Sequence, residues 1–166
     1  MLLDVSQILR NQGEILDFEE KISLDNDEFK SQRIEFKAPA YVKGTVKNVG
    51  GVLVLEMKVS GSFNAVCDRC LKEITGKVEF LDEQSFVKSE SEEKGEDALV
   101  LTDKKIDLCD LVIKGIFANL PSKNLCSEDC KGICHKCGAD LNLEECKCKD
   151  DGDWNPQFEI LKGLFS

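Results

Sequence analysis

Hydrophobic and polar residues alternate through the middle of the chain, which is the pattern of β-strands with one buried face. A first alternating run covers residues 42–47 and ends at turn residues. In a longer second run, the apolar residues all fall on one face: Leu53, Leu55, Met57, Val59, Phe63 and Ala65. Gly61 lies inside this run and predicts a bulge or bend. A third run at 74–80 predicts a returning strand, so the three form an antiparallel meander.

The apolar spacing changes to a helical period after residue 106. One face then collects Leu108, Leu111, Val112, Gly115 and Ile116. We predict a helix over residues 106–119, with Thr102 or Asp103 as its cap and Pro121 just past its end. Cys109 falls beside the apolar stripe, where a free cysteine packs as a small hydrophobe.

These patterns predict an α+β protein. Residues 1–120 are expected to form the antiparallel β-meander sheet with its packed helix, although the first thirty residues mix both periods and predict no definite element. A short strand is predicted at 99–101. Residues 121–150 form a small cysteine-rich module, and 151–166 fit a final helix that docks on the sheet.

The chain has 166 residues and a formal net charge of −10. Residues 81–110 hold ten acidic and four basic side chains, so most of the excess lies in one segment. Its centre, about 88–98, has no large apolar side chain and is expected to be a mobile, solvated loop. This charge neither supports nor excludes a nucleic-acid partner, because phosphate binding depends on a local basic surface.

The sequence predicts a cytoplasmic protein with no membrane partner. No apolar run approaches the roughly 20 residues that span a bilayer, and the first ten residues lack the features of a secretory signal. Thiols stay reduced in the cytosol. The nine cysteines therefore indicate metal or redox chemistry rather than a disulfide scaffold.

Eight of the nine cysteines fall in clusters with metal-ligand spacing. A Cys-x-x-Cys turn lets both thiolates reach one ion, and four thiolates close a structural zinc site. A first site is predicted from four cysteines whose connecting chain is short: Cys134, Cys137, Cys146 and Cys148. A second site would pin the module to the hairpin, and its predicted ligands are Cys67, Cys70, Cys126 and Cys130. A competing partition joins Cys126 and Cys130 with Cys134 and Cys137.

One or two structural zinc ions are therefore expected. They would stabilise the module at 121–150, which holds few large apolar side chains and should be unfolded without metal. A redox dithiol at Cys67 and Cys70 and an iron–sulfur cluster are the alternatives. A catalytic zinc is disfavoured, since it would want an open position with His or carboxylate ligands.

Four lysines and a histidine surround the second cysteine cluster and are candidates for partner contacts: Lys131, His135, Lys136, Lys147 and Lys149. His135 is expected to be an exposed side chain rather than a ligand. Residues 123–149 nonetheless hold five Lys and five acidic side chains. Each zinc bound by four thiolates adds a net charge of about −2. The module is therefore not basic, which favours a protein partner over direct binding of nucleic acid.

Three features occur in a characteristic order along the chain. They are the hairpin motif Cys67-Asp-Arg-Cys70-Leu71, the helix that leads to Leu120-Pro121, and the cysteine-rich motif from Leu125 to Cys148. Together they resemble the YceD family, the large ribosomal RNA subunit accumulation proteins. The resemblance implies a bacterial cytosolic factor needed for normal accumulation or processing of 23S rRNA, with no established enzymatic activity. By position, it makes Arg69 a candidate for a phosphate or acidic contact.

We therefore predict a non-enzymatic ribosome-biogenesis factor that binds precursor ribosomal RNA or a ribosomal protein through a zinc-stabilised surface, with no small-molecule substrate. The alternative is a redox-sensitive zinc-binding regulator, in which oxidation of Cys67 and Cys70 releases metal. An enzyme is disfavoured because the chain has no G-x-G-x-x-G, P-loop, G-x-S-x-G or H-E-x-x-H pattern. Its single histidine also leaves little general acid–base equipment.

Overall fold

The computed structural model of the protein describes residues 1–88, 98–101 and 103–148. Its elements in chain order are β1 (Leu2–Asp4), β2 (Ile15–Ile22), the 3-10 helix η1 (Asn26–Gln32), β3 (Ile34–Glu35), β4 (Ala40–Val49), β5 (Val52–Val66), β6 (Glu73–Val87), β7 (Leu99–Val100), β8 (Lys105–Asp107) and α1 (Leu108–Asn119). The described part is mostly β-sheet with one α-helix, which confirms the α+β class.

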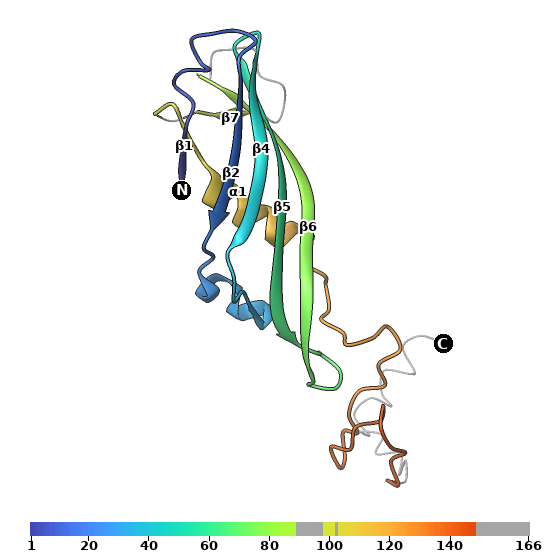
Figure 1. Ribbon diagram of the computed structural model, residues 1–166. Helices are drawn as coiled ribbons and strands as arrows, with labels where there is room; N and C mark the ends of the chain where they lie inside the picture. Colours follow the sequence, from blue (N-terminus) through green and yellow to red (C-terminus); the bar gives the residue numbers. More distant parts are fainter. Residues whose placement is uncertain (89–97, 102, 149–166) are drawn as a thin grey trace, which may run out of the picture.

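The main sheet has the strand order β2-β4-β5-β6-β7, and its long strands run side by side in Figure 1. β4, β5 and β6 form the predicted antiparallel meander. β2 adds an antiparallel strand outside β4, and β3 pairs with one end of β5. β7 pairs parallel to β6, so the prediction of a purely antiparallel sheet is wrong at this edge. A parallel pair needs a long connection, and residues 88–98 join these two strands.

The β5–β6 ladder runs without interruption from Leu53 to Val66. Gly61 lies directly opposite Val78 within it, so of the predicted bulge or bend, the bulge is absent. The sequence explains this result, because the buried positions on either side of Gly61 keep the same alternation and leave no extra residue. The six apolar residues assigned to one face are indeed all buried: Leu53, Leu55, Met57, Val59, Phe63 and Ala65.

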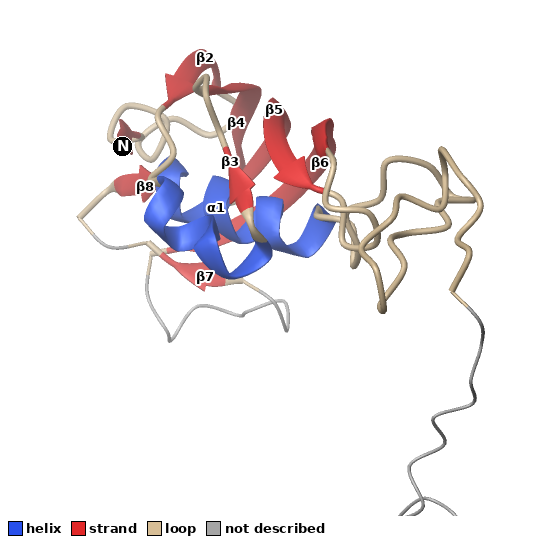
Figure 2. Cartoon of the chain, turned by 90° about the horizontal axis from the view of Figure 1, so that it is seen from below, coloured by secondary structure: helices blue, strands red, loops and turns tan. Residues whose placement is uncertain are grey.

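α1 covers one face of the sheet, together with η1 (Figure 2). The helix packs so closely on β6 that a Cβ atom on Gly115 would overlap the ring of Phe80. Leu108, Val112 and Ile116 are buried in the same core as the sheet residues, and Cys109 packs against that core as predicted. The hydrophobic core therefore lies between α1 and the inner face of the meander.

The predicted helix start at residue 106 is wrong by two residues. Residues 105–107 form β8, which pairs with β1 in a separate two-stranded sheet. Asp107 is the N-cap, because its carboxylate accepts a hydrogen bond of 3.0 Å from the N–H of Cys109. This cap replaces the predicted Thr102 or Asp103. The predicted helix end at Asn119 is confirmed.

Two further predictions fall outside the described residues: the acidic loop, apart from its ends, and the final helix at 151–166. None of the helices in the described ranges is long and apolar enough to cross a membrane.

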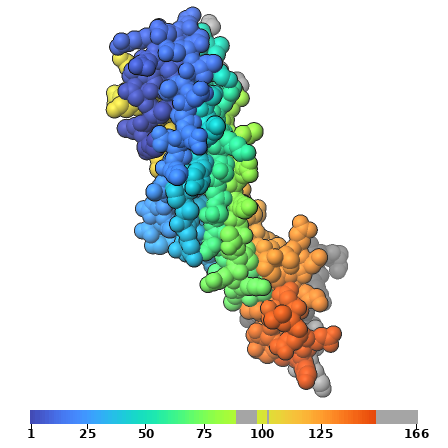
Figure 3. Space-filling model, viewed as in Figure 1, coloured from blue at the N-terminus to red at the C-terminus, as the bar shows by residue number. Residues whose placement is uncertain are grey.

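The cysteine-rich segment continues from α1 and lies beyond the turn between β5 and β6, at the end of the molecule opposite the N-terminus (Figures 1 and 3). Residues 121–148 contain turns and one isolated β-bridge, between Ile133 and Asp140. The buried residues of this segment are Asn124, Cys130, Gly132 and Cys134. Apolar packing therefore contributes little to its structure, so its side-chain clusters decide how it is held.

Candidate metal centre

The turn between β5 and β6 brings two thiols together. The N–H of Cys67 donates to the carbonyl of Lys72 at 2.8 Å, and the N–H of Leu71 donates to the carbonyl of Cys67 at 2.9 Å. Leu71 adopts a left-handed conformation with φ 61° to close this turn. The turn holds Cys67 and Cys70 at the tip of the longest hairpin in the described part of the chain.

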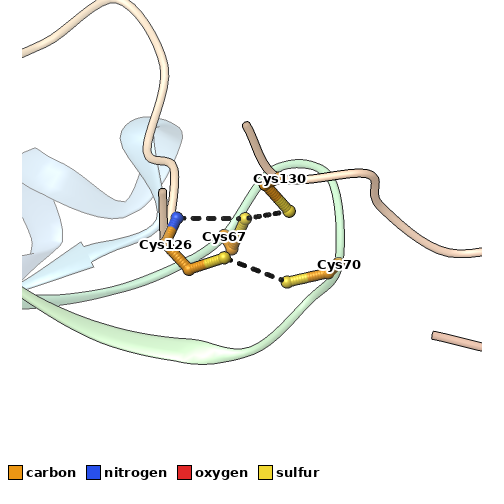
Figure 4. Close-up of side chains that lie close together, drawn as sticks. All are labelled: Cys67, Cys70, Cys126 and Cys130. Carbon is orange, nitrogen blue, oxygen red and sulfur yellow. Dashed lines mark hydrogen bonds between the residues drawn. The ribbon is translucent and has the colours of Figure 1, made fainter. Parts of the chain in front are cut away.

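Two cysteines from the cysteine-rich segment complete this group, which we call the hairpin site. Cys130 Sγ lies 3.8 Å from Cys67 Sγ, and Cys126 Sγ lies 3.6 Å from Cys70 Sγ (Figure 4). The N–H of Cys126 also points at Cys67 Sγ, at 3.4 Å. All four sulfur atoms lie within 4.8 Å of one another.

A reciprocal pair of hydrogen bonds joins the start of the segment to the hairpin. The N–H of Asp68 donates to the carbonyl of Asn124, and the N–H of Asn124 donates to the Asp68 carboxylate, both at 2.8 Å. The buried amide of Asn124 also donates to the carbonyl of Gln32 at 3.2 Å, at the end of η1. These contacts place Leu125 and Cys126 beside the hairpin tip.

Arg69 fixes the next part of the segment. Its guanidinium donates to the carbonyls of Glu128, at 3.2 Å, and Cys130, at 2.8 Å. Its own carbonyl accepts a hydrogen bond from the N–H of Ile133 at 3.1 Å. The guanidinium predicted to meet a phosphate or acidic group is thus engaged within the chain, and its contact with a partner stays a prediction.

The remaining four clustered cysteines form a second group, which we call the knuckle site. Cys146 Sγ lies 3.3 Å from Cys134 Sγ and 3.5 Å from Cys137 Sγ. Gly138 has φ 74° and donates its N–H to the carbonyl of Cys134 at 2.8 Å, which closes the turn. With Cys148, the four sulfur atoms lie within 4.8 Å of one another.

Both groups contain one thiol that ionises easily. The backbone N–H of Cys70 donates to Cys67 Sγ and lowers the pKa of Cys67 to about 6, despite burial. The backbone N–H groups of Cys137 and Lys136 act in the same way on Cys134, whose pKa is also about 6. One thiolate in each site is therefore stabilised by backbone dipoles.

A second thiol in each site resists ionisation. A backbone hydrogen bond from Lys72 favours the Cys70 thiolate, but burial and the neighbouring sulfur atoms outweigh it and raise the pKa of Cys70 to about 12. The N–H of Cys148 favours the Cys146 thiolate in the same way, yet the other sulfurs raise the pKa of Cys146 to about 12. Four crowded thiolates need a positive charge at their centre, and a bound cation deprotonates coordinating thiols outright.

The sulfur geometry fits tetrahedral zinc. A Zn–S distance of about 2.3 Å gives S···S edges of about 3.8 Å in a tetrahedron. The close S···S distances are 3.6–3.8 Å in the hairpin site and 3.3–3.5 Å in the knuckle site. Four thiolates leave no open position for a substrate, so both groups suit structural ions. Tetrahedral sulfur sets also suit iron–sulfur clusters.

The structure divides the eight cysteines in the same two groups as the favoured partition, and it separates the pairs joined in the competing one. The short loop from Cys137 to Cys146 closes on itself in the knuckle site. Cys109 belongs to neither group, and His135 is exposed and belongs to neither. Whether metal fills the groups is part of the proposal below.

Three of the predicted partner contacts, Lys131, His135 and Lys136, line one surface hollow of about 520 Å³. The hollow lies against Cys134 and Cys146 of the knuckle site, and Glu144 and Glu145 line it too. Its charge is therefore mixed. Lys147 is exposed outside this lining, and Lys149 lies outside the described residues.

Sequence reasoning did not single out Asp68, Asn124 and Asn142, which bind the backbone or sulfur of the sites. The available signal was local, since Asp and Asn beside cysteine turns often bond to loop N–H groups. Their partners could not be predicted. Asn124 and Asp68 lie 56 positions apart, and Asn142 lies 12 positions from Cys130.

Comparison with known proteins identifies a matching family. The family described as "Large ribosomal RNA subunit accumulation protein YceD" matches residues 55–165. An uncharacterized protein of Mycobacterium leprae is 28% identical over 149 residues, which cover 87% of this chain and 69% of that protein. Uncharacterized proteins of Mycobacterium tuberculosis and Mycobacterium bovis are each 33% identical over 82 residues, which cover 47% of this chain and 40% of theirs.

No solved structure is significantly similar to the chain. The family match begins within β5, includes all eight clustered cysteines and covers well over half of the sequence. The resemblance predicted from the cysteine motifs is thereby confirmed. The chain belongs to the YceD family of large ribosomal RNA subunit accumulation proteins.

Proposed function

We propose that the protein is a non-enzymatic, cytoplasmic ribosome-biogenesis factor that supports the accumulation or processing of 23S rRNA. Membership of the YceD family supports a ribosome-related role. The observation that carries the proposal is the pair of four-sulfur groups, which close one surface segment on itself and onto the tip of the β5–β6 hairpin. Such an arrangement builds a rigid projecting surface rather than an open reaction centre.

Zinc is the ion that this donor set fits best. The hairpin site would hold one ion, and the knuckle site would hold a second. Structural zinc contributes on the order of 10–16 kcal/mol of folding free energy in small modules. That contribution is large for a segment with little apolar packing of its own. The ions supply structure only, and the side chains around them supply the contacts.

The charge around the sites favours a ribosomal protein over precursor rRNA as the direct partner. The hollow beside the knuckle site combines the cations of Lys131 and Lys136 with the carboxylates of Glu144 and Glu145. The Arg69 guanidinium already binds backbone carbonyls. Each filled site would add a net charge of about −2. A surface of this kind suits a basic protein better than a phosphate backbone.

A depletion and complementation experiment tests the role. Cells depleted of the protein should lose mature 23S rRNA, and the wild-type chain should restore it. A Cys134→Ser/Cys137→Ser double variant should fail to restore it. Cys109→Ala is the matched control and should succeed, because Cys109 belongs to neither sulfur group. Unchanged 23S rRNA after depletion would remove the proposal.

The partner is tested separately. Ultraviolet crosslinking and co-purification from the same cells should recover a basic ribosomal protein, and charge reversal at Glu144 and Glu145 should reduce that recovery. Strong crosslinks to precursor rRNA without a protein partner would instead assign the surface to RNA.

One observation keeps a redox-sensitive zinc regulator as the second candidate. Cys126, Cys137 and Cys148 are exposed, so oxidants can reach both sulfur groups. Mild peroxide should then release zinc and unfold the segment, and a thiol reductant should reverse both changes. Zinc content that survives mild peroxide would exclude this candidate and leave the first untouched.

A further inference from the structure

The side chain of Asn142 connects the two sulfur groups. Asn142 belongs to the loop between Cys137 and Cys146, which are both in the knuckle site. Its amide Nδ2 nevertheless lies 3.6 Å from Sγ of Cys130, a member of the hairpin site. Cys130 is buried, with 3% of its surface exposed, whereas Asn142 is exposed, so its side chain covers this buried sulfur from the surface.

The neighbouring hydrogen bonds fix the orientation of this amide. The N–H of Lys131 donates to Asn142 Oδ1 at 2.8 Å, which only the oxygen of the amide can accept. Asn142 Nδ2 also donates to the Asp140 carboxylate at 2.7 Å. The amide therefore presents its N–H side, and not its oxygen, to the sulfur of Cys130.

The rest of the loop is closed against the short linker between the two sites. The N–H of Leu141 donates to the carbonyl of Gly132 at 2.9 Å, and Ile133 forms a β-bridge with Asp140. Gly132 has φ 79° and lies against the Arg69 carbonyl, where a Cβ atom would come within 3.0 Å. The loop that closes the knuckle site is thus the same structure that covers Cys130.

We propose that Asn142 is a positioning residue that couples metal binding at the two sites. The proposal rests on the proposed function in requiring that both groups bind metal. Closure of the knuckle site shapes the loop that carries Asn142, and its N–H then bonds to the Cys130 thiolate. A hydrogen bond of this kind offsets part of the excess negative charge on four thiolates and strengthens metal binding. By linkage, metal at the hairpin site strengthens the knuckle site by the same factor.

The substitution Asn142→Asp separates this role from a purely structural one. It retains an acceptor for the N–H of Lys131 and nearly the same shape, but it places an oxygen instead of an N–H against Cys130 Sγ. The new oxygen also faces the Asp140 carboxylate, so the variants are compared in an Asp140→Asn background, which removes the repulsion between two carboxylates. In that background, a residue that only shaped the loop would tolerate Asn142→Asp better than Asn142→Ala. A residue that donates to the thiolate would tolerate it no better.

Chelator competition on the full chain provides the first test. Loss of a group that hydrogen-bonds a metal ligand typically lowers metal affinity by roughly 10- to 100-fold. We expect Asn142→Asp and Asn142→Ala each to weaken the hairpin site by about 10-fold. Cys137→Ser removes a thiolate of the knuckle site, and it should weaken metal binding at the hairpin site by a similar factor. In the Asn142→Asp background, Cys137→Ser should then have little additional effect on the hairpin site.

Cadmium NMR supplies a second readout and a control. Cadmium-loaded protein should give one resonance for each site, and the hairpin resonance is the one lost in Cys67→Ser. Asn142→Asp should shift that resonance. Asn119→Asp is the matched control. Asn119 Nδ2 donates to the Gly115 carbonyl at 2.9 Å in α1, away from the sulfur groups, so this substitution should shift neither cadmium resonance. A wild-type hairpin affinity and resonance in both Asn142 variants would overturn the coupling. Fewer than two bound ions in the wild-type chain would instead overturn the metal arrangement itself.

Discussion

Asp68 and Asn124 are joined by two hydrogen bonds of 2.8 Å, although 56 positions separate them in the chain. Each residue donates its backbone N–H, one to a carbonyl and the other to a carboxylate. Asp68 follows the first cysteine of the hairpin turn, and Asn124 precedes the first cysteine of the cysteine-rich segment by two residues. The pair therefore holds the start of the cysteine-rich segment, and with it Cys126, beside Cys67. Backbone hydrogen bonds thus help to hold the four cysteines of the hairpin site together.

Removing the Asp68 carboxylate should loosen this junction. Asp68→Ala leaves the N–H of the buried Asn124 without an acceptor, and an unsatisfied buried group costs about 1–3 kcal/mol. We expect a loss of stability in that range, measured by urea unfolding, together with faster zinc loss to a chelator. Asp17→Ala is the control, because Asp17 is exposed on β2. An equal effect of both substitutions would contradict the role of the pair.

The capping of α1 can be tested at Asp107. Its carboxylate accepts the N–H of Cys109 at 3.0 Å, so Asp107→Ala should cost roughly 1 kcal/mol of unfolding free energy. Asp107→Ser keeps a capping oxygen and should lose much less. The urea midpoint, with an unchanged slope, measures both variants. Equal midpoints for the two would show that the cap contributes little.

The same carboxylate predicts a pH dependence. Burial tends to raise the pKa of Asp107, but hydrogen bonds from the N-terminal ammonium and the N–H of Cys109 outweigh it, so the pKa is lowered. A lowered folded-state pKa gives stability that is present above the unfolded value, about 3.9, and lost as the pH falls through the folded value. Wild type should therefore exceed Asp107→Asn in stability at neutral pH, and urea midpoints should converge in acid. A constant difference across that range would contradict this titration.

The contact between Gly115 and Phe80 predicts an unusual helix substitution. In an exposed helix, Gly→Ala stabilises by about 1 kcal/mol. Here the new Cβ would overlap the buried Phe80 ring, and overpacking typically costs about 1–3 kcal/mol. Gly115→Ala should therefore destabilise the protein in thermal or urea unfolding. The penalty should shrink in a Phe80→Leu background, and an equal penalty in both backgrounds would place its cause elsewhere.

The alternation of apolar and polar residues predicts more of the fold than any other feature of the sequence. The strict alternation from Leu53 to Ala65 predicted both the long strand and its buried face, because one face packs under α1 while the other remains open. β7 was recognised as a strand, but its direction was not, since the direction depends on the route of the connection from Val87. The predicted helix includes part of β8, because Ile106 fits both the two-residue period of a strand and the 3.6-residue period of a helix.

The candidate site was predictable in its ligands and much less so in its supports. Short spacing limits which thiols can meet, and that limit alone favoured the observed grouping of Cys134 and Cys137 with Cys146 and Cys148. The supports depend on contacts between distant segments. Asn124 reaches a hairpin formed 56 positions earlier, and Arg69 turns to the carbonyl of Cys130, which no local pattern encodes.

Metal removal should separate the two parts of the molecule. The sheet and α1 share an apolar core, whereas residues 121–148 depend on the sulfur groups. A strong chelator under reducing conditions should abolish amide protection in 121–148 and leave protection of β4, β5 and β6 nearly unchanged. Protection of the segment that persists without metal would contradict its dependence on zinc.

The zinc content of the purified, reduced protein tests the central claim most directly. The account predicts two zinc ions per chain in the wild type, one in Cys67→Ser, one in Cys134→Ser and two in Cys109→Ala. Fewer than two ions in the wild type, or two ions retained in either Cys67→Ser or Cys134→Ser, would contradict the account of two separate four-cysteine sites.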